Sequence, residues 1–180
     1  MKVLGITGTI GSGKGTIVDY LVKEKGYEHY SVRDYMKKEI VKRGLPLNRD
    51  SMVIVANDLR KKNSPSFITD QLYSEAKNSG VDSVIESIRT PGEVYSLREK
   101  ANFYLLAVDA DPGIRYERIK KRGSETDDIS FETFIKNEER EMNSEDPNHQ
   151  NLQRCIEMAD VCFMNDGSIA ELLRNVDDYL

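Results

Sequence analysis

Residues 8 to 16, GTIGSGKGT, place four glycines and one lysine within nine positions. Gly8, Gly13 and Lys14 match the spacing G-x-x-x-x-G-K of a phosphate-binding loop. Glycine lets main-chain N–H groups turn inward around phosphate oxygens, and the lysine bridges the outer phosphates of a nucleotide. The pattern predicts that ATP binds along the residues Thr9, Ile10, Gly11, Ser12, Gly13, Lys14, Gly15 and Thr16.

The position after Lys14 departs from the common form of this loop. A Ser or Thr usually follows the lysine and places its hydroxyl on Mg²⁺, whereas this chain has Gly15 there and the hydroxyl comes at Thr16. We therefore expect Mg²⁺ to rest mainly on ATP oxygens and water, with Thr16 as the metal-binding residue of the loop.

The composition excludes several classes of protein. The 180 residues carry a formal charge of −5, without the dominant basic stripe that holds a nucleic-acid backbone. Two cysteines and two histidines provide neither a zinc cluster nor a disulfide framework, and no apolar run is long enough to span a bilayer. We expect a cytoplasmic protein with a small-molecule nucleotide substrate and no nucleic-acid or membrane partner. The sequence carries no signal for the oligomeric state.

Strands and helices alternate around the loop. KVLGIT, residues 2 to 7, reads as a buried strand, and apolar residues on one face predict a helix from Lys14 to Lys25, ended by Gly26. Four more predicted strands cover 27–31, 82–88, 104–109 and 160–165, and five more predicted helices cover 34–44, 50–59 (capped by Asp50 or Ser51), 66–76, 91–100 and 113–122. Such alternation predicts a doubly wound parallel sheet with helices on both faces.

One segment departs from this pattern. Residues 123 to 150 are rich in acidic side chains and contain few large apolar ones. They cannot fill a layer of the core, so we expect either an exposed, mostly helical surface segment or a lid that closes over bound nucleotide.

The loop GSGKGT resembles that of adenylate kinase and its nucleoside monophosphate kinase relatives, which commonly contains GKGT. The resemblance implies an α/β P-loop kinase with a doubly wound five-stranded parallel sheet, helices on both faces and a helical lid. It also implies a single domain over residues 1–180, with the acceptor bound near residues 32–80 and the lid near 123–150. The cofactors would be ATP and Mg²⁺.

Two further segments resemble the acceptor side of that family. SVRDYMK at 31–37 is similar to the family's STGDMLR, so Ser31, Arg33, Asp34 and Lys37 are implied to face the acceptor, with Lys37 where the family has arginine. VIESIRT at 84–90 is similar to the end of the family's third strand and places an arginine just beyond it.

Arg89 follows the carboxyl end of a predicted strand, where open α/β sheets bind ligands, and is the best candidate for the acceptor phosphate. The alternative is a surface arginine that pairs with Glu93. Glu86 lies in an otherwise apolar strand, so we expect it to bond Mg²⁺-bound water or Lys14.

YERIKKR at 116–122 resembles the start of the family's lid, which implies that Arg118 and Arg122 face ATP as catalytic cations together with Lys14. TDDISFETFIKNEER is similar to a second lid motif and adds Arg140. A closer likeness is to small, mostly archaeal adenylate kinase-related proteins of poorly defined function, which have RGL, ELR, DGIRSxxEV and NDG or NEG in this order. This chain has RGL at 43–45, DLR at 58–60, ESIRTPGEV at 86–94 and NDG at 165–167. Glu86 and Ser87 replace that group's Asp and Gly.

The implied reaction is transfer of the ATP γ-phosphoryl group to a (deoxy)nucleoside monophosphate, which requires positioning and charge neutralisation rather than a general base. Two alternatives stay open. One is a nucleotide-binding regulatory module that senses ATP or AMP without turnover. The other is dephospho-coenzyme A kinase, in which Asp34 would act as base toward a sugar hydroxyl. The base of the acceptor is also left open, among Asn48, Asn57, Arg60, Gln71 and their neighbours.

Overall fold

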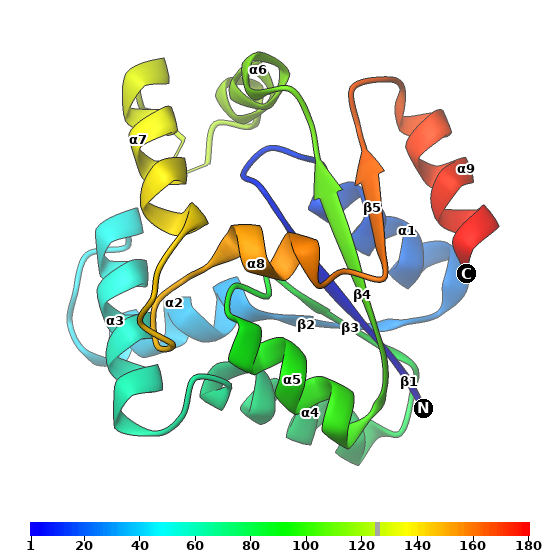
Figure 1. Cartoon of the computed structure of the whole chain (residues 1–180), viewed down its shortest axis with the longest axis horizontal. Coiled ribbons are helices and arrows are strands. Elements are labelled where there is room, and N and C mark those ends of the chain that lie inside the picture. The colour runs from blue at the N-terminus through cyan, green and yellow to red at the C-terminus, as the bar shows by residue number, and fades with distance from the viewer. Residues whose placement is uncertain (125–126) are drawn as a thin grey trace.

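A computed structural model of the chain describes residues 1–124 and 127–180. Its centre is a five-stranded sheet in the order β2-β3-β1-β4-β5 (Figure 1). Every neighbouring pair of strands is parallel. The strands are β1 (Lys2–Gly8), β2 (Glu28–Ser31), β3 (Ser83–Glu86), β4 (Asn102–Asp109) and β5 (Val161–Met164). This confirms the predicted doubly wound α/β P-loop kinase fold and its five parallel strands.

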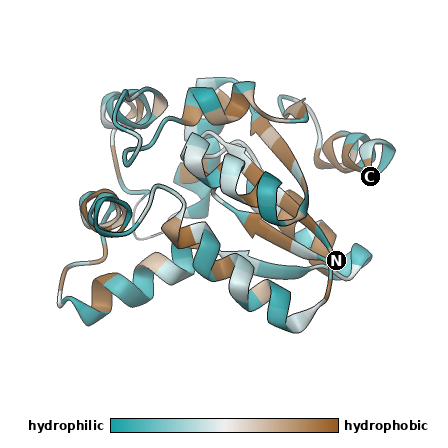
Figure 2. Ribbon diagram, turned by 60° about the horizontal axis from the view of Figure 1, so that its bottom comes forward, coloured by the Kyte–Doolittle hydropathy of each residue, from teal (hydrophilic) through white to brown (hydrophobic). Residues whose placement is uncertain are grey.

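Helices cover both faces of the sheet because apolar side chains of β1 alternate between them. Val3 packs into a core with α2, α3, α4, α5 and α8, whereas Leu4 and Ile6 pack into a second core with α1 and α9. Figure 2 shows hydrophobic residues on the strands and on helix sides that face them. The helices are α1 (Lys14–Lys25), α2 (Val32–Lys42), α3 (Arg49–Lys62), α4 (Phe67–Ser79), α5 (Pro91–Lys100), α6 (Pro112–Arg122), α7 (Phe131–Met142), α8 (Leu152–Glu157) and α9 (Ile169–Tyr179).

Two predicted helix starts were wrong. Helix α3 is capped by Asn48, whose side chain accepts a hydrogen bond from the main-chain N–H of Ser51 at 2.9 Å, rather than by Asp50 or Ser51. Helix α2 begins at Val32 because Ser31 caps it, accepting from the N–H of Asp34 at 3.1 Å. In both cases the side chain that satisfies the unpaired N–H groups of the first turn lies earlier than the apolar periodicity indicated.

The segment 123–150 contains α7, which covers 12 of its residues, so the segment is less helical than predicted. Positions 125 and 126 of the expected lid lie outside the described residues. In the part of the chain that is described, no helix combines the length and apolar character needed to cross a membrane.

Candidate functional site

Parallel strands bring their carboxyl ends to one edge of the sheet, and the glycine-rich loop lies there between β1 and α1. Gly8, Gly11 and Gly13 adopt φ values of 136°, 76° and 109°, in the region that favours glycine. A Cβ at Gly11 would come within 2.5 Å of the Arg115 carbonyl oxygen, so the main chain at Arg115 leaves no room for a side chain at this position. No side chain caps α1, which leaves the N–H groups of its first turn available to an anion.

Lys14 reaches back across this loop. Its Nζ donates hydrogen bonds to the carbonyl oxygens of Gly8 at 2.9 Å and Thr9 at 2.6 Å. Burial lowers the pKa of Lys14 to about 7, and the positive charge of Arg89 contributes in the same direction. A polyphosphate bound in the loop would bring negative charge close to Lys14 and favour its protonated form.

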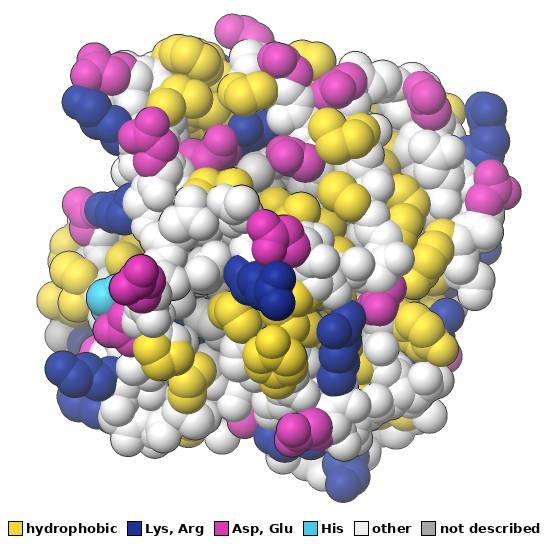
Figure 3. Space-filling view, in the orientation of Figure 1, with side chains coloured by type: hydrophobic (Ala, Val, Ile, Leu, Met, Phe, Trp, Pro, Cys, Tyr) yellow, Lys and Arg dark blue, Asp and Glu magenta, His cyan; other side chains and the backbone are white. Residues whose placement is uncertain are grey.

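A cavity of about 590 Å³ begins at the loop and extends to α2 and α3. Among the described residues its wall contains cationic, acidic and apolar groups. The cations are Lys14, Arg33, Arg49, Arg60, Arg89, Arg118 and Arg122, and the carboxylates are Glu86 and Glu141. The apolar part is formed mainly by Val32, Met36, Met52, Val53 and Ala56. The surface is notched on the left of Figure 3, between α7 above and α3 below, with charged side chains of both signs at its edges.

Arg89 points its guanidinium group to the cavity wall, where Glu141 of α7 accepts from its Nη1 at 2.5 Å and Gln150 at 3.3 Å. Glu93 instead accepts from the main-chain N–H of Arg89 at 2.7 Å. The alternative of an Arg89 side chain paired with Glu93 is therefore wrong, because the Glu93 carboxylate is already occupied by the start of α5 and by Arg60 at 3.1 Å.

Arg118 and Arg122 both line the cavity from α6. Arg118 donates to the carbonyl oxygen of Asn165 at 2.8 Å, and the Asn165 amide donates to the carbonyl oxygen of Ser12 at 2.7 Å. Arg122 donates through Nε and Nη2 to the two oxygens of Asp127, each at 2.7 Å. Arg118 is thus connected to the phosphate loop through Asn165, which follows β5, and Arg122 is held at the start of the segment expected to form the lid.

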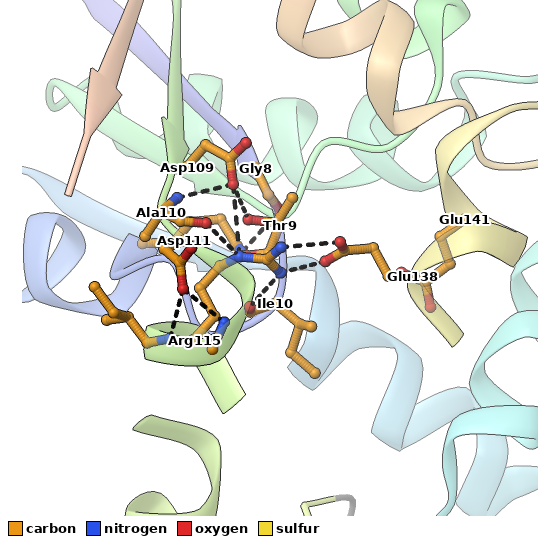
Figure 4. Close-up of polar contacts among 12 residues, drawn as sticks. Gly8, Thr9, Ile10, Asp109, Ala110, Asp111, Arg115, Glu138 and Glu141 are labelled. Atoms are coloured by element: carbon orange, nitrogen blue, oxygen red, sulfur yellow. Dashed lines mark hydrogen bonds and ion pairs between the residues drawn. The ribbon is translucent and has the colours of Figure 1, made fainter. Parts of the chain in front are cut away.

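Arg115 connects three segments around the loop (Figure 4). Its side chain is buried, its Nε donates to the Ala110 carbonyl at 2.7 Å, and its Nη1 donates to the Ile10 carbonyl at 3.3 Å. Glu138 of α7 accepts from Nη1 and, at 2.9 Å, from Nη2. The ring of Phe134 lies 5.4 Å from the guanidinium carbon. One arginine therefore fixes the position of the loop relative to α7.

Several residues predicted for the site lie outside the cavity wall. Lys37 is 4.0 Å from Asp34, and neither side chain lines the cavity. Arg140 pairs with Asp50 at 2.9 Å on the outside of α3. Ser31 lies next to the wall, where its hydroxyl donates to Glu86 at 3.3 Å. The structure brings Arg33, Arg89, Arg118 and Arg122 together with Thr16 and Glu86 and leaves Lys37 and Arg140 apart from them.

Sequence reasoning missed the roles of Arg49, Arg115, Asp109 and Glu141. Asp109 accepts from the Thr9 hydroxyl at 2.6 Å and from the Ala110 N–H at 2.8 Å, and so fixes the start of the loop. Its place at the end of β4 was an available signal, because side chains that follow parallel strands face the ligand edge. Ser87, the replacement for a glycine in the resembling group, has φ 67° and keeps a glycine-like backbone in the cavity wall.

A magnesium site on this edge would use few protein ligands. Thr16 and Glu86 both line the cavity, and residues 1–124 and 127–180 contain no group of three or more His, Cys, Asp or Glu side chains that could hold a metal ion. A hydroxyl and one carboxylate fit Mg²⁺ that takes its remaining ligands from phosphate and water, as this ion commonly does.

Comparison with known proteins places the chain in a family. A family model described as an AAA domain matches residues 4–146. A UPF0200 protein from Methanococcus maripaludis is 30% identical, over 99% of this chain and 95% of its own length. Among solved structures, TT1252 from Thermus thermophilus has a TM-score of 0.60 at 21% identity, covering 99% of this chain and 95% of that chain.

A shikimate kinase from Bacteroides thetaiotaomicron has a TM-score of 0.54 at 10% identity, covering 99% of this chain and 97% of that chain. At these identities the likeness to solved structures concerns the fold, which is that of P-loop small-molecule kinases. The chain belongs to the AAA domain family and to the UPF0200 proteins.

Proposed function

We propose that this protein is an ATP-dependent phosphotransferase that moves the γ-phosphoryl group of ATP to a (deoxy)nucleoside monophosphate. The observation that carries the proposal is a single cavity that joins the phosphate loop to an arginine cluster and an apolar wall. Transfer of this kind needs two nucleotides held in line and their negative charge neutralised. The cavity offers both features within one volume.

The donor side rests on the loop. Main-chain N–H groups of the loop and of the first turn of α1 bind the phosphates, and Lys14 leaves the carbonyls of Gly8 and Thr9 to bridge the outer ones. Arg118 and Arg122 neutralise charge from the facing helix α6. Mg²⁺ would be held by Thr16 and, through water, by Glu86, and would neutralise and orient the phosphate oxygens.

The acceptor side rests on Arg89 and on α2 and α3. Arg89 lines the same cavity as Lys14, and its positive charge lowers the pKa of Lys14. The apolar wall of Val32, Met36, Met52, Val53 and Ala56 suits the face of a nucleobase, because ligand sites combine apolar walls with a few placed polar groups. An acceptor with a phosphate at one end and a flat, weakly polar ring at the other matches this distribution.

A hydroxyl acceptor, as in dephospho-coenzyme A kinase, would require a carboxylate base near the second strand. Asp34 was the candidate, but its side chain is 66% exposed and does not line the cavity. This placement favours a phosphate acceptor, which needs no base. The sensor alternative is disfavoured by the cations of α6, which a module that only binds nucleotide would not require.

A phosphotransfer screen tests the proposal. ATP and Mg²⁺ are incubated with each ribo- and deoxynucleoside monophosphate, and separately with dephospho-coenzyme A, shikimate and gluconate, while ADP formation is followed. We expect ADP to form with at least one nucleoside monophosphate. ADP formed only with a hydroxyl acceptor, or with none, would refute the proposed reaction.

A further inference from the structure

A buried carboxylate joins two arginines in the wall of the cavity. Glu141 of α7 accepts from Arg49 Nη2 at 2.6 Å and from Arg89 Nη1 at 2.5 Å. The three side chains come from α7, from the start of α3 and from the segment after β3, and they are 6%, 17% and 18% exposed respectively. No part of the predicted site included Arg49 or Glu141.

Glu141 is ionised in this arrangement. Burial alone would raise its pKa, but the charges of Arg89 and Arg49 outweigh burial, and the pKa lies below the ordinary value of a glutamate. Two guanidinium groups and one carboxylate leave one net positive charge beside the cavity. The carboxylate also offsets the repulsion between the two arginines, which would otherwise push them apart.

The bridge uses only part of the hydrogen-bonding capacity of Arg89. An arginine has five N–H donors in a planar fork, and Glu141 and Gln150 both accept from Nη1. Its Nε and Nη2 donate to no residue within 1–124 or 127–180, and neither is among the buried atoms that lack a partner. These donors therefore reach the cavity that Arg89 lines, where an anion can accept from them.

We propose that Arg49 and Arg89 together bind the phosphate of the acceptor, and that Glu141 is a positioning residue that holds both guanidinium groups for this purpose. The inference rests on the proposed function and adds the residue that replaces Lys37, which lies outside the cavity. Paired arginines suit a phosphate monoester, because its dianionic group accepts several charge-assisted hydrogen bonds at once.

Arg49 and Arg89 line the same cavity as Lys14 of the donor loop. Arg89 lowers the pKa of Lys14 through its charge, so the acceptor site and the donor loop lie within electrostatic reach of one another. Arg49 and the apolar residues Val53 and Ala56 are spaced by four and seven positions along α3, which places them on one helical face. A phosphate held by Arg49 and Arg89 therefore leaves the rest of the acceptor against the apolar wall.

A different role for Glu141 would give the opposite result. If the carboxylate occupied the place of the acceptor phosphate and had to be displaced, its neutralisation would tighten acceptor binding. If it positions the arginines, its neutralisation weakens binding. The sign of the effect separates the two roles, which a loss of stability alone would not do.

The test uses Arg49→Gln and Glu141→Gln in the full chain, with Arg49→Lys and Glu141→Asp as milder variants should either fail to fold. Arg43→Gln and Glu132→Gln are matched controls, because they remove a charge from exposed ion pairs with Asp58 and Lys136 outside the cavity. Steady-state kinetics give the Michaelis constants for the acceptor and for ATP separately.

We expect Arg49→Gln and Glu141→Gln each to raise the acceptor Michaelis constant by roughly tenfold to a hundredfold, the range for a lost hydrogen bond to a charged group, with little change for ATP. Arg49→Lys should raise the acceptor Michaelis constant less than Arg49→Gln does. An unchanged acceptor constant in Arg49→Gln would overturn the role of Arg49. A lower constant in Glu141→Gln would overturn the positioning role.

A second measurement separates this inference from the proposed function. If no nucleoside monophosphate is phosphorylated, thermal unfolding is followed with increasing inorganic phosphate while a non-hydrolysable ATP analogue saturates the loop. Stabilisation by phosphate that Arg49→Gln abolishes would support the arginine pair as an anion site even though the proposed reaction had failed. No stabilisation, or the same stabilisation in Arg49→Gln, would overturn it.

Discussion

Replacement of Glu138 by glutamine should destabilise the protein and loosen the phosphate loop together. Glu138 accepts from both terminal nitrogens of Arg115, whose other donors bond the carbonyls of Ala110 and Ile10. The variant keeps the shape of the side chain but removes its charge. Arg115, with a side chain that is 3% exposed, is then left with Asp109, 3.7 Å from its Nε, as its one remaining charged partner among the described residues.

The magnitude follows from burial. Removal of one partner from a buried ion pair costs about 3–5 kcal/mol. Glu138 is 16% exposed and glutamine still offers one oxygen, so we take the lower end of that range, about 3 kcal/mol. With an unfolding entropy of about 2.1 cal/mol/K per residue, a chain of this length should lose roughly 8 °C in melting temperature.

Urea unfolding and calorimetry measure this directly. Glu132→Gln is the matched control on α7, because it breaks an exposed pair with Lys136, 2.7 Å apart, and should unfold like the wild type. The Arg115→Met/Glu138→Met double variant should lose less stability than Arg115→Met and Glu138→Met lose in sum. The double variant removes both charges of the pair, whereas each single variant leaves one of them without its partner. A Glu138→Gln variant that unfolds within about 0.5 kcal/mol of wild type, or an additive double variant, would refute this account of the network.

Three further predictions concern the two substrate sites. Lys14→Ala should reduce turnover by orders of magnitude while far-ultraviolet circular dichroism stays unchanged; retained activity would reject the donor site. Because the pKa of Lys14 is lowered to about 7, the folded protein without nucleotide has largely lost this proton above that pH. Phosphate binding should restore it, so calorimetry in buffers of different ionisation enthalpy should show uptake of about 0.9 proton at pH 8 and about 0.1 at pH 6. Equal uptake by Lys14→Ala would contradict this assignment. Arg89→Ala should raise the Michaelis constant of the acceptor far more than that of ATP. A larger rise for ATP than for the acceptor would assign Arg89 to the donor site.

The phosphate loop and the sheet could be predicted because their signals are local. Gly8, Gly13 and Lys14 have a fixed spacing, and the backbone angles they require are set by neighbouring residues. Strands such as β4 are buried on both faces and therefore appear as continuous apolar runs. Helix α9 was not predicted although its signal was available, because Ile169, Leu172 and Val176 recur at helical spacing after Ser168, which caps the helix.

The acceptor side could not be predicted in full because it depends on contacts between distant residues. Arg49 and Glu141 are 92 positions apart, and nothing in the local sequence indicates that they form an ion pair. Lys37 matched a family motif, yet its position on α2 turns it away from the cavity. Arg115 looks like one of several basic residues on an exposed helix, and only the packing of α6 against the loop and α7 buries it.

Binding of a bisubstrate analogue, two nucleosides joined by five phosphates, tests most directly whether donor and acceptor share one continuous cavity. Its acceptor base would be the one selected by the phosphotransfer screen, and calorimetry would compare it with ATP alone. We expect binding at least a hundredfold tighter than ATP, because one molecule then contacts both the loop and Arg89, and we expect Lys14→Ala and Arg89→Ala each to weaken it. Binding no tighter than that of ATP, and indifferent to Arg89, would contradict the two-site account.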